Sequence, residues 1–142
     1  MKAKLPLIAR ILLGLIFTVF GGMFFFTKPQ FPEGTPQDMI TFFQGLMASH
    51  YFLYLLKSTE VICGLLLLSG AFVPLALVVL APIIVNIVCV HTFIAPSGFP
   101  LAAFIAILEI YLAFFSPKYS PIVKQLFRCP MREEMLAKKG SV

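Results

Sequence analysis

Charged residues are scarce in this sequence: 12% of its 142 residues are Asp, Glu, Lys or Arg, whereas 60% are hydrophobic. An average soluble domain has about one quarter charged residues. A chain of this length could not hide so much apolar surface from water, so we predict that lipid is its solvent. The basic residues form no stripe with interleaved aromatic side chains, and we therefore expect no nucleic-acid partner.

Cysteine is also rare, and its three copies, Cys63, Cys89 and Cys129, form no CxxC pair. This spacing is typical of neither a disulfide framework nor a zinc site, and we expect the thiols within the spans to be small buried apolar groups. No nucleophile–base motif and no Gly-rich phosphate loop is present. We expect no metal site, no intrinsic cofactor and no stand-alone enzyme. A role as an accessory subunit of an oxidoreductase system stays open.

Long apolar runs separated by turn residues predict an all-α, polytopic membrane four-helix bundle. The predicted spans are about residues 5–27, 51–70, 74–95 and 99–116, within a domain of residues 1–117. The first span is predicted to be retained, because it is longer than a signal-peptide core and no cleavage site follows it. Its Gly14, Thr18 and Gly21/Gly22 lie on one face, which favours close helix contact. Residues 118–142 are predicted to form a basic tail with one or two short surface helices.

The connection between the first two spans begins with a proline-rich segment, residues 28–36. After it, Thr35 is the predicted N-cap of a helix of about 14 residues, with Pro36 at the first helical position and Asp38 following. Apolar residues at helical spacing, Met39 and Phe43 among them, make this helix amphipathic. Because it is too short to span a bilayer, we expect it to lie on the membrane surface or to cap the bundle.

The distribution of basic residues predicts the orientation of the spans. Nine Lys or Arg residues lie at the two ends of the chain, one lies in the connection of residues 28–50, and the other two turns have none. Basic residues favour the cytoplasmic side. We therefore expect both termini to be cytoplasmic, with the basic residues, Lys2, Lys4 and Arg10 included, as anchors on anionic lipid.

Five polar side chains interrupt the last three spans. They are Lys57 and Glu60 in the second span, Asn86 and His91 in the third, and Glu109 in the fourth. At a rise of about 1.5 Å per residue, three of them would lie about 13–15 Å from the outer end of their helices. Charged groups cost about 2.5–3.5 kcal/mol each within a span, so such residues are functional candidates.

The charges of this set lead to two interpretations. Lys57 and Glu60 are three residues apart and can pair on one helix face. Glu109 has no cation close in sequence, and we expect it to be the carboxyl held neutral, as a proton carrier or as a donor to a polar ligand head. Alternatively, Lys57, Glu60 and Glu109 form an interhelical clasp that only stabilises the bundle, with Asn86 as a further hydrogen-bonding group.

Several segments resemble the DoxX family of bacterial membrane proteins over about residues 8–115. They include ARILLGLIF, the K-x-x-E-x-x-x-G pattern that begins at Lys57, and the P-x-x-x-N-x-x-x-x-H pattern that ends at His91. The resemblance implies a bundle similar to vitamin K epoxide reductase, located in the bacterial cytoplasmic (inner) membrane. Family members are linked to thiosulfate:quinone oxidoreduction and to stress complexes. The absence of CxxC excludes the dithiol relay of the epoxide reductase.

Together these observations predict a DoxX-like protein that binds a lipophilic, quinone-like ligand in support of a redox or stress-response partner. Glu60 and Glu109 would hydrogen-bond or protonate the ligand head, Lys57 would balance charge, and Asn86 would orient the head. A non-catalytic assembly protein, whose polar cluster is a clasp, is the alternative. A small proton-coupled transporter is a third interpretation, and it requires a homo-oligomer because four spans enclose only a narrow pathway.

Overall fold

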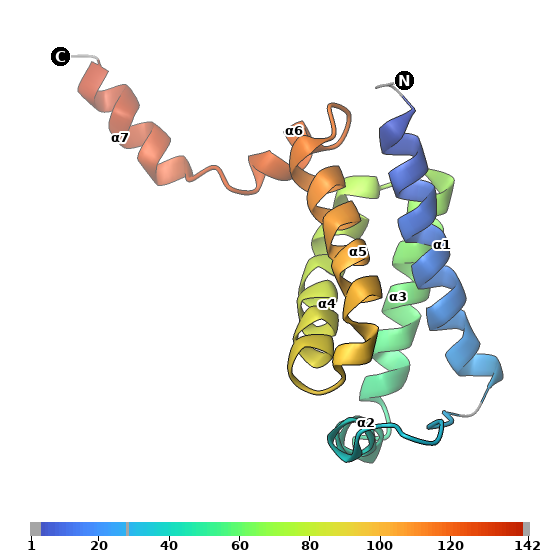
Figure 1. Cartoon of the computed structure of the whole chain (residues 1–142). Coiled ribbons are helices and arrows are strands. Elements are labelled where there is room, and N and C mark those ends of the chain that lie inside the picture. The colour runs from blue at the N-terminus through green and yellow to red at the C-terminus, as the bar shows by residue number, and fades with distance from the viewer. Residues whose placement is uncertain (1–3, 28, 141–142) are drawn as a thin grey trace.

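The computed structural model describes residues 4–27 and 29–140, and within these ranges it contains helices and no strands. Four long apolar helices form the body of the molecule (Figure 1). They are α1 (Leu5–Phe26), α3 (Phe52–Ser69), α4 (Val73–Phe93), and a fourth span made of the 3-10 turn η1 (Pro96–Gly98), α5 (Phe99–Ile110) and the π-helical turn η2 (Tyr111–Phe115). The predicted all-α four-helix arrangement is confirmed, with span ends within a few residues of those expected.

The four spans pack in a ring, with α1 against α3, α3 against α4, α4 against α5, and α5 against α1. The first described residues and the turn between α3 and α4 lie at one end of the bundle, and α2 (Gln37–Ala48) covers the other end (Figure 1). An even number of spans returns the chain to the side on which it started. The cytoplasmic location of that side stays a prediction.

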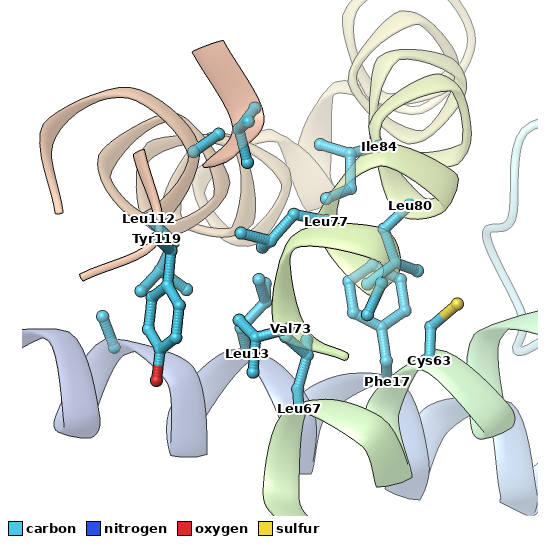
Figure 2. Packing of buried hydrophobic residues seen from close by; sticks show 14 of the residues in the cluster. Leu13, Phe17, Cys63, Leu67, Val73, Leu77, Leu80, Ile84, Leu112 and Tyr119 are labelled. Atoms are coloured by element: carbon cyan, nitrogen blue, oxygen red, sulfur yellow. The ribbon is translucent and has the colours of Figure 1, made fainter. Parts of the chain in front are cut away.

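Large aliphatic side chains from every span meet in one continuous core (Figure 2). Leu13 of α1, Leu67 of α3, Leu80 of α4 and Leu112 of η2 are all completely buried. The outward faces of the same helices are also apolar, as expected for helices whose outer faces contact lipid. Packing between the helices therefore sets their arrangement, whereas their apolar composition alone indicates that they lie in a membrane.

The closest helix pair is α1 with α3, and small residues allow the approach. A Cβ added to Gly64 of α3 would lie 2.5 Å from the Thr18 hydroxyl oxygen and 3.0 Å from the Gly14 carbonyl oxygen of α1. A Cβ added to Gly21 would lie 3.2 Å from the Cβ of Glu60. The predicted small-residue face is thus confirmed for Gly14, Thr18 and Gly21. Gly22 has open space around its Cα and takes no part in the contact.

Helix α2 is amphipathic, as predicted, but its start differs from the expectation. Its N-cap is Pro36, and no side chain caps it. The Thr35 hydroxyl instead donates a hydrogen bond to the Pro32 carbonyl (2.7 Å), which tightens the preceding turn. The proline-rich sequence therefore uses Thr35 within its own loop, because Pro36 already provides a φ angle compatible with a helix start.

The chain after η2 forms the two short helices that the sequence predicted, α6 (Ser120–Gln125) and α7 (Pro130–Gly140). They differ in their contacts with the bundle. Tyr119 and Val123, at and within α6, are buried in the core, so the packed unit extends beyond residue 117. Helix α7 projects away from the bundle (Figure 1), and its described side chains are exposed.

The basic residues near the N-terminus do not share one environment. Lys2 lies outside the described residues, and Lys4 is exposed. The role of these residues as lipid anchors stays a prediction. Arg10 is only partly exposed, and its guanidinium packs against Gly70, the left-handed residue (φ 79°) that ends α3. A cation there complements the partial negative charge at a helix C-terminus. Arg10 therefore has a packing role within the bundle.

Candidate functional site

A cavity of about 330 Å³, which we call the central cavity, lies between α1, α3, α4 and α5 and is bounded by α2. Its polar lining residues are Lys57, Glu60, Asn86 and His91. Four of the five polar candidates from the sequence therefore meet at one place. Apolar residues of α2 complete the lining (Met39, Phe42, Phe43 and Leu46), so the amphipathic helix caps this cavity with its hydrophobic face.

Lys57 and Glu60 form an ion pair within α3. The Lys57 ammonium donates a hydrogen bond to Glu60 Oε2 at 2.8 Å, and their side chains are 21% and 5% exposed. The pair is possible at this burial because the two residues lie one helical turn apart on the same face. Gly21 of α1 lets the neighbouring backbone pack directly behind Glu60. Lys57 and Glu60 therefore balance each other's charge without a ligand. Two ammonium hydrogens of Lys57 remain as donors for one.

The two polar residues of α4 contribute an amide and an imidazole ring. Asn86 is exposed along the cavity wall, and none of the described residues hydrogen-bonds its amide. The His91 ring lies 3.1 Å from the Ala95 carbonyl through Nδ1. Because a carbonyl oxygen only accepts, Nδ1 bears the hydrogen, and Nε2 of a neutral ring is then an acceptor.

His91 also borders a hollow on the other side of the cavity wall. This hollow is formed by residues 29–36 and by Ala95, Ser97 and Gly98. Met39 and Phe43 of α2 line both spaces as well. His91 and α2 thus separate the central cavity from the loop that the topology places outside the bilayer.

Glu109 does not line the central cavity, and this corrects the expectation that Glu60 and Glu109 face one ligand. Its carboxyl lines a second hollow of about 440 Å³, the lateral groove, between α4, α5, η2 and α6. The fourth span begins at Pro96 instead of residue 99, so Glu109 lies about one helical turn deeper than predicted.

The predicted interhelical clasp is not formed by the described residues. The Lys57–Glu60 pair lies within one helix, and Glu109 Oε2 has no hydrogen-bond partner among the described residues. An ion pair within α3 cannot fix the register of two helices. The clasp would require Glu109 to reach Lys57, whereas the two residues line separate spaces.

A π-helical turn begins two residues after Glu109, at Tyr111. In η2 the Ser116 amide donates to the Tyr111 carbonyl at 2.8 Å, five residues back. Such turns are rare and often occur at functional sites. Val123 and Phe127, which close the groove at its tail end, come from the segment that the sequence had assigned to a separate tail. The sequence did not predict these groove residues, because the apolar stretches after the proline are too short to show a helical periodicity.

All three cysteines are free thiols. Cys63 is buried in the core beside Phe17 (Figure 2), as expected for a small apolar group. Cys89 is exposed on α4 and lines the lateral groove, which corrects the expectation that it is buried. Within the described residues no group of three His, Cys, Asp or Glu side chains could hold a metal ion.

Four apolar membrane-spanning helices around a cavity with four polar lining residues define a multi-pass membrane protein of the helical-bundle class. Residues 5–95 match the family model described as DoxX, and the chain therefore belongs to the DoxX family. The match includes α1 to α4 and the four polar residues of the central cavity, whereas Glu109 lies outside it. No curated protein and no solved structure gives a significant match to the chain. The likeness to vitamin K epoxide reductase stays a prediction.

Proposed function

We propose that this DoxX-family protein binds a lipophilic ligand with a quinone-like head in the central cavity, and that it does so in support of a redox or stress-response partner. The proposal rests on one observation: polar groups of α3 and α4 meet in an otherwise apolar cavity within the bundle. Its volume, about 330 Å³, lies in the range of small-molecule sites and is sufficient for a ring head.

The polar groups suit both oxidation states of a quinone. The two carbonyl oxygens of the oxidised head accept hydrogen bonds, for which the Lys57 ammonium and the Asn86 amide are donors. The two hydroxyls of the reduced head donate, for which the Glu60 carboxylate and His91 Nε2 are acceptors. Reduction takes two electrons and two protons. In this proposal a partner protein supplies the electrons, and the cavity residues bind the head and exchange its protons.

Asn86→Leu is expected to weaken binding of decylubiquinone about tenfold, because the proposed hydrogen bond from the Asn86 amide to the quinone head is lost and an apolar group replaces it. Asn86 makes no hydrogen bond to the described residues, so folding should be preserved. Binding to purified, reconstituted protein can be measured by native mass spectrometry or equilibrium titration. Thr92→Val is the matched control on α4, since that hydroxyl bonds the Val88 carbonyl and lies outside the cavity.

Equal affinity in Asn86→Leu and wild type would contradict the proposed role of the cavity. A second arm examines protein extracted gently from its own membranes. If no small lipophilic molecule is retained, and the same polypeptide co-purifies with wild type and with Glu60→Gln, the assembly interpretation replaces ligand binding. A molecule retained by wild type and lost in Glu60→Gln would support the proposal and identify its ligand.

We also propose that both termini are cytoplasmic in a bacterial inner membrane, with residues 29–36 outside. A thiol introduced by Gln30→Cys, at an exposed position, should then react with a membrane-impermeant maleimide on intact spheroplasts. The exposed Cys129 near the other end of the chain is a built-in control, since it should react only after permeabilisation. The opposite pattern of labelling would reverse the assigned orientation.

A further inference from the structure

The lateral groove contains one ionisable side chain, Glu109, in an apolar setting. Glu109 is 6% exposed, and its Oε2 has no hydrogen-bond partner among the described residues. The rest of the groove lining is apolar apart from the thiol of Cys89, and no Lys, Arg or His contributes to it. A buried polar group without a partner costs about 1–3 kcal/mol in folded proteins. Stability alone does not explain this carboxyl, because leucine would pack there without that cost.

The groove opens towards lipid. Val85 (62% exposed) and Cys89 on α4, and Ile110 (51%) on α5, lie at its border and are exposed on the outer surface of the bundle. At its tail end the Phe114 and Phe127 rings pack together at 5.7 Å between centroids. A molecule could therefore enter sideways from the bilayer, with its polar end next to Glu109.

The size of the groove indicates the kind of occupant. A volume of about 440 Å³ falls within the range of small-molecule sites. A transmembrane helix is about 10–12 Å wide with its side chains and would be too large to sit within it. The apolar walls fit a hydrocarbon body, and the carboxyl fits a head that donates a hydrogen bond.

We propose that the lateral groove is a second ligand site, separate from the central cavity, which takes a lipophilic molecule whose hydroxyl or amine head donates a hydrogen bond to Glu109. This site would select heads that donate hydrogen bonds, whereas a site for oxidised quinones selects heads whose carbonyl oxygens only accept them. The two sites share no polar residue: Glu109 lines the groove and not the cavity, whereas Lys57, Glu60, Asn86 and His91 line the cavity and not the groove. Failure of one proposal therefore leaves the other standing.

The test uses three photoreactive probes with the same diazirine-bearing C16 chain and different heads: an alcohol, a primary amine and a methyl ether. The full chain is reconstituted in liposomes, irradiated with each probe, and digested, and adducts are mapped by mass spectrometry to residues 78–89 and 106–114. The alcohol or the amine is expected to label these segments about tenfold more than the ether, which cannot donate a hydrogen bond.

Two substitutions of Glu109 separate the head chemistries. Glu109→Leu removes the acceptor and should reduce labelling by the preferred probe to the level of the ether. Glu109→Gln keeps an acceptor oxygen, so labelling by the alcohol should persist. Labelling by the amine, which is an ammonium at neutral pH, should be lost because the substitution removes the negative charge that would balance it. Either pattern supports the site and identifies its head group. Thr92→Val, which lies outside both the groove and the central cavity, should leave labelling of the groove unchanged.

Two results would overturn the proposal. One is equal labelling of the groove by all three probes, which would show that the carboxyl selects nothing. The other is labelling of Glu109→Gln and Glu109→Leu that equals wild type for every probe. Circular dichroism and gel filtration of each variant establish that it is folded. Glu109→Gln keeps the shape of the side chain, so it tests an amine head even where Glu109→Leu fails to fold.

Discussion

Lys57→Met is expected to destabilise the protein by about 3 kcal/mol, because it leaves the Glu60 carboxylate buried without its cation. That value lies at the lower end of the range for broken buried pairs, since the Lys57 side chain keeps 21% exposure. The Glu60 side chain is 5% exposed, and Lys57 is its ion-pair partner. The free energy of unfolding, or the apparent Tm in a defined detergent, measures the loss.

The double variant Lys57→Met/Glu60→Gln should recover most of that stability, since two neutral groups of similar volume replace both charges. It should still fail to bind decylubiquinone if the central cavity recognises a polar head. The double variant therefore separates the effect of this ion pair on stability from its effect on ligand binding. Arg128→Met is the control for simple loss of a cation, because the Arg128–Glu133 pair has side chains that are 65% and 54% exposed. Exposed ion pairs contribute little, so its Tm should not change.

Gly64→Ala is expected to lower stability by about 1–3 kcal/mol, the usual cost of overpacking an interior contact. The new methyl group would meet the Thr18 backbone nitrogen at 2.7 Å and the Gly14 carbonyl oxygen at 3.0 Å. Backbone atoms cannot rotate away, so α1 and α3 must separate. The central cavity should change too, since α1 packs behind Glu60. Thermal unfolding and decylubiquinone binding would both report the change.

Gly22→Ala is the matched control, because it adds the same methyl group to α1 where nothing lies within 4 Å. Its stability should be unchanged or slightly raised, since alanine favours a helix by about 1 kcal/mol over glycine. If both glycine variants unfold at the same temperature, the close α1–α3 contact does not determine stability, and the small-residue face has another role.

Much of the fold could be predicted from local patterns. The four spans follow from apolar runs of sufficient length, and turn residues such as Gly70 mark their ends. The α1 face of Gly14, Thr18 and Gly21 follows from helical spacing alone. Helix starts were less predictable. Thr35 had the residue type of an N-cap, yet its hydroxyl bonds Pro32, because a proline-rich loop competes for the same group.

The candidate site was predicted only in part. Lys57 and Glu60 had to share a face, since they are three residues apart on one helix. The structure places Lys57 Nζ 2.8 Å from Glu60 Oε2. Asn86 and His91 join them through the packing of α4 on α3. Glu109 was predicted at the same level and lies instead in the lateral groove. The error arose from the start of the fourth span, because η1 adds a turn before α5.

The sequence by itself determined that this chain spans a membrane with four helices and places ionisable groups inside it, because hydropathy and residue order are local properties. Only the tertiary structure decided which of those groups share a cavity. Residues 105 and 109 lie on one buried face of α5, yet Ile105 lines the central cavity and Glu109 the lateral groove. The physical reason is that depth and rotation of a helix relative to its neighbours are set by packing between helices, which no single helix encodes.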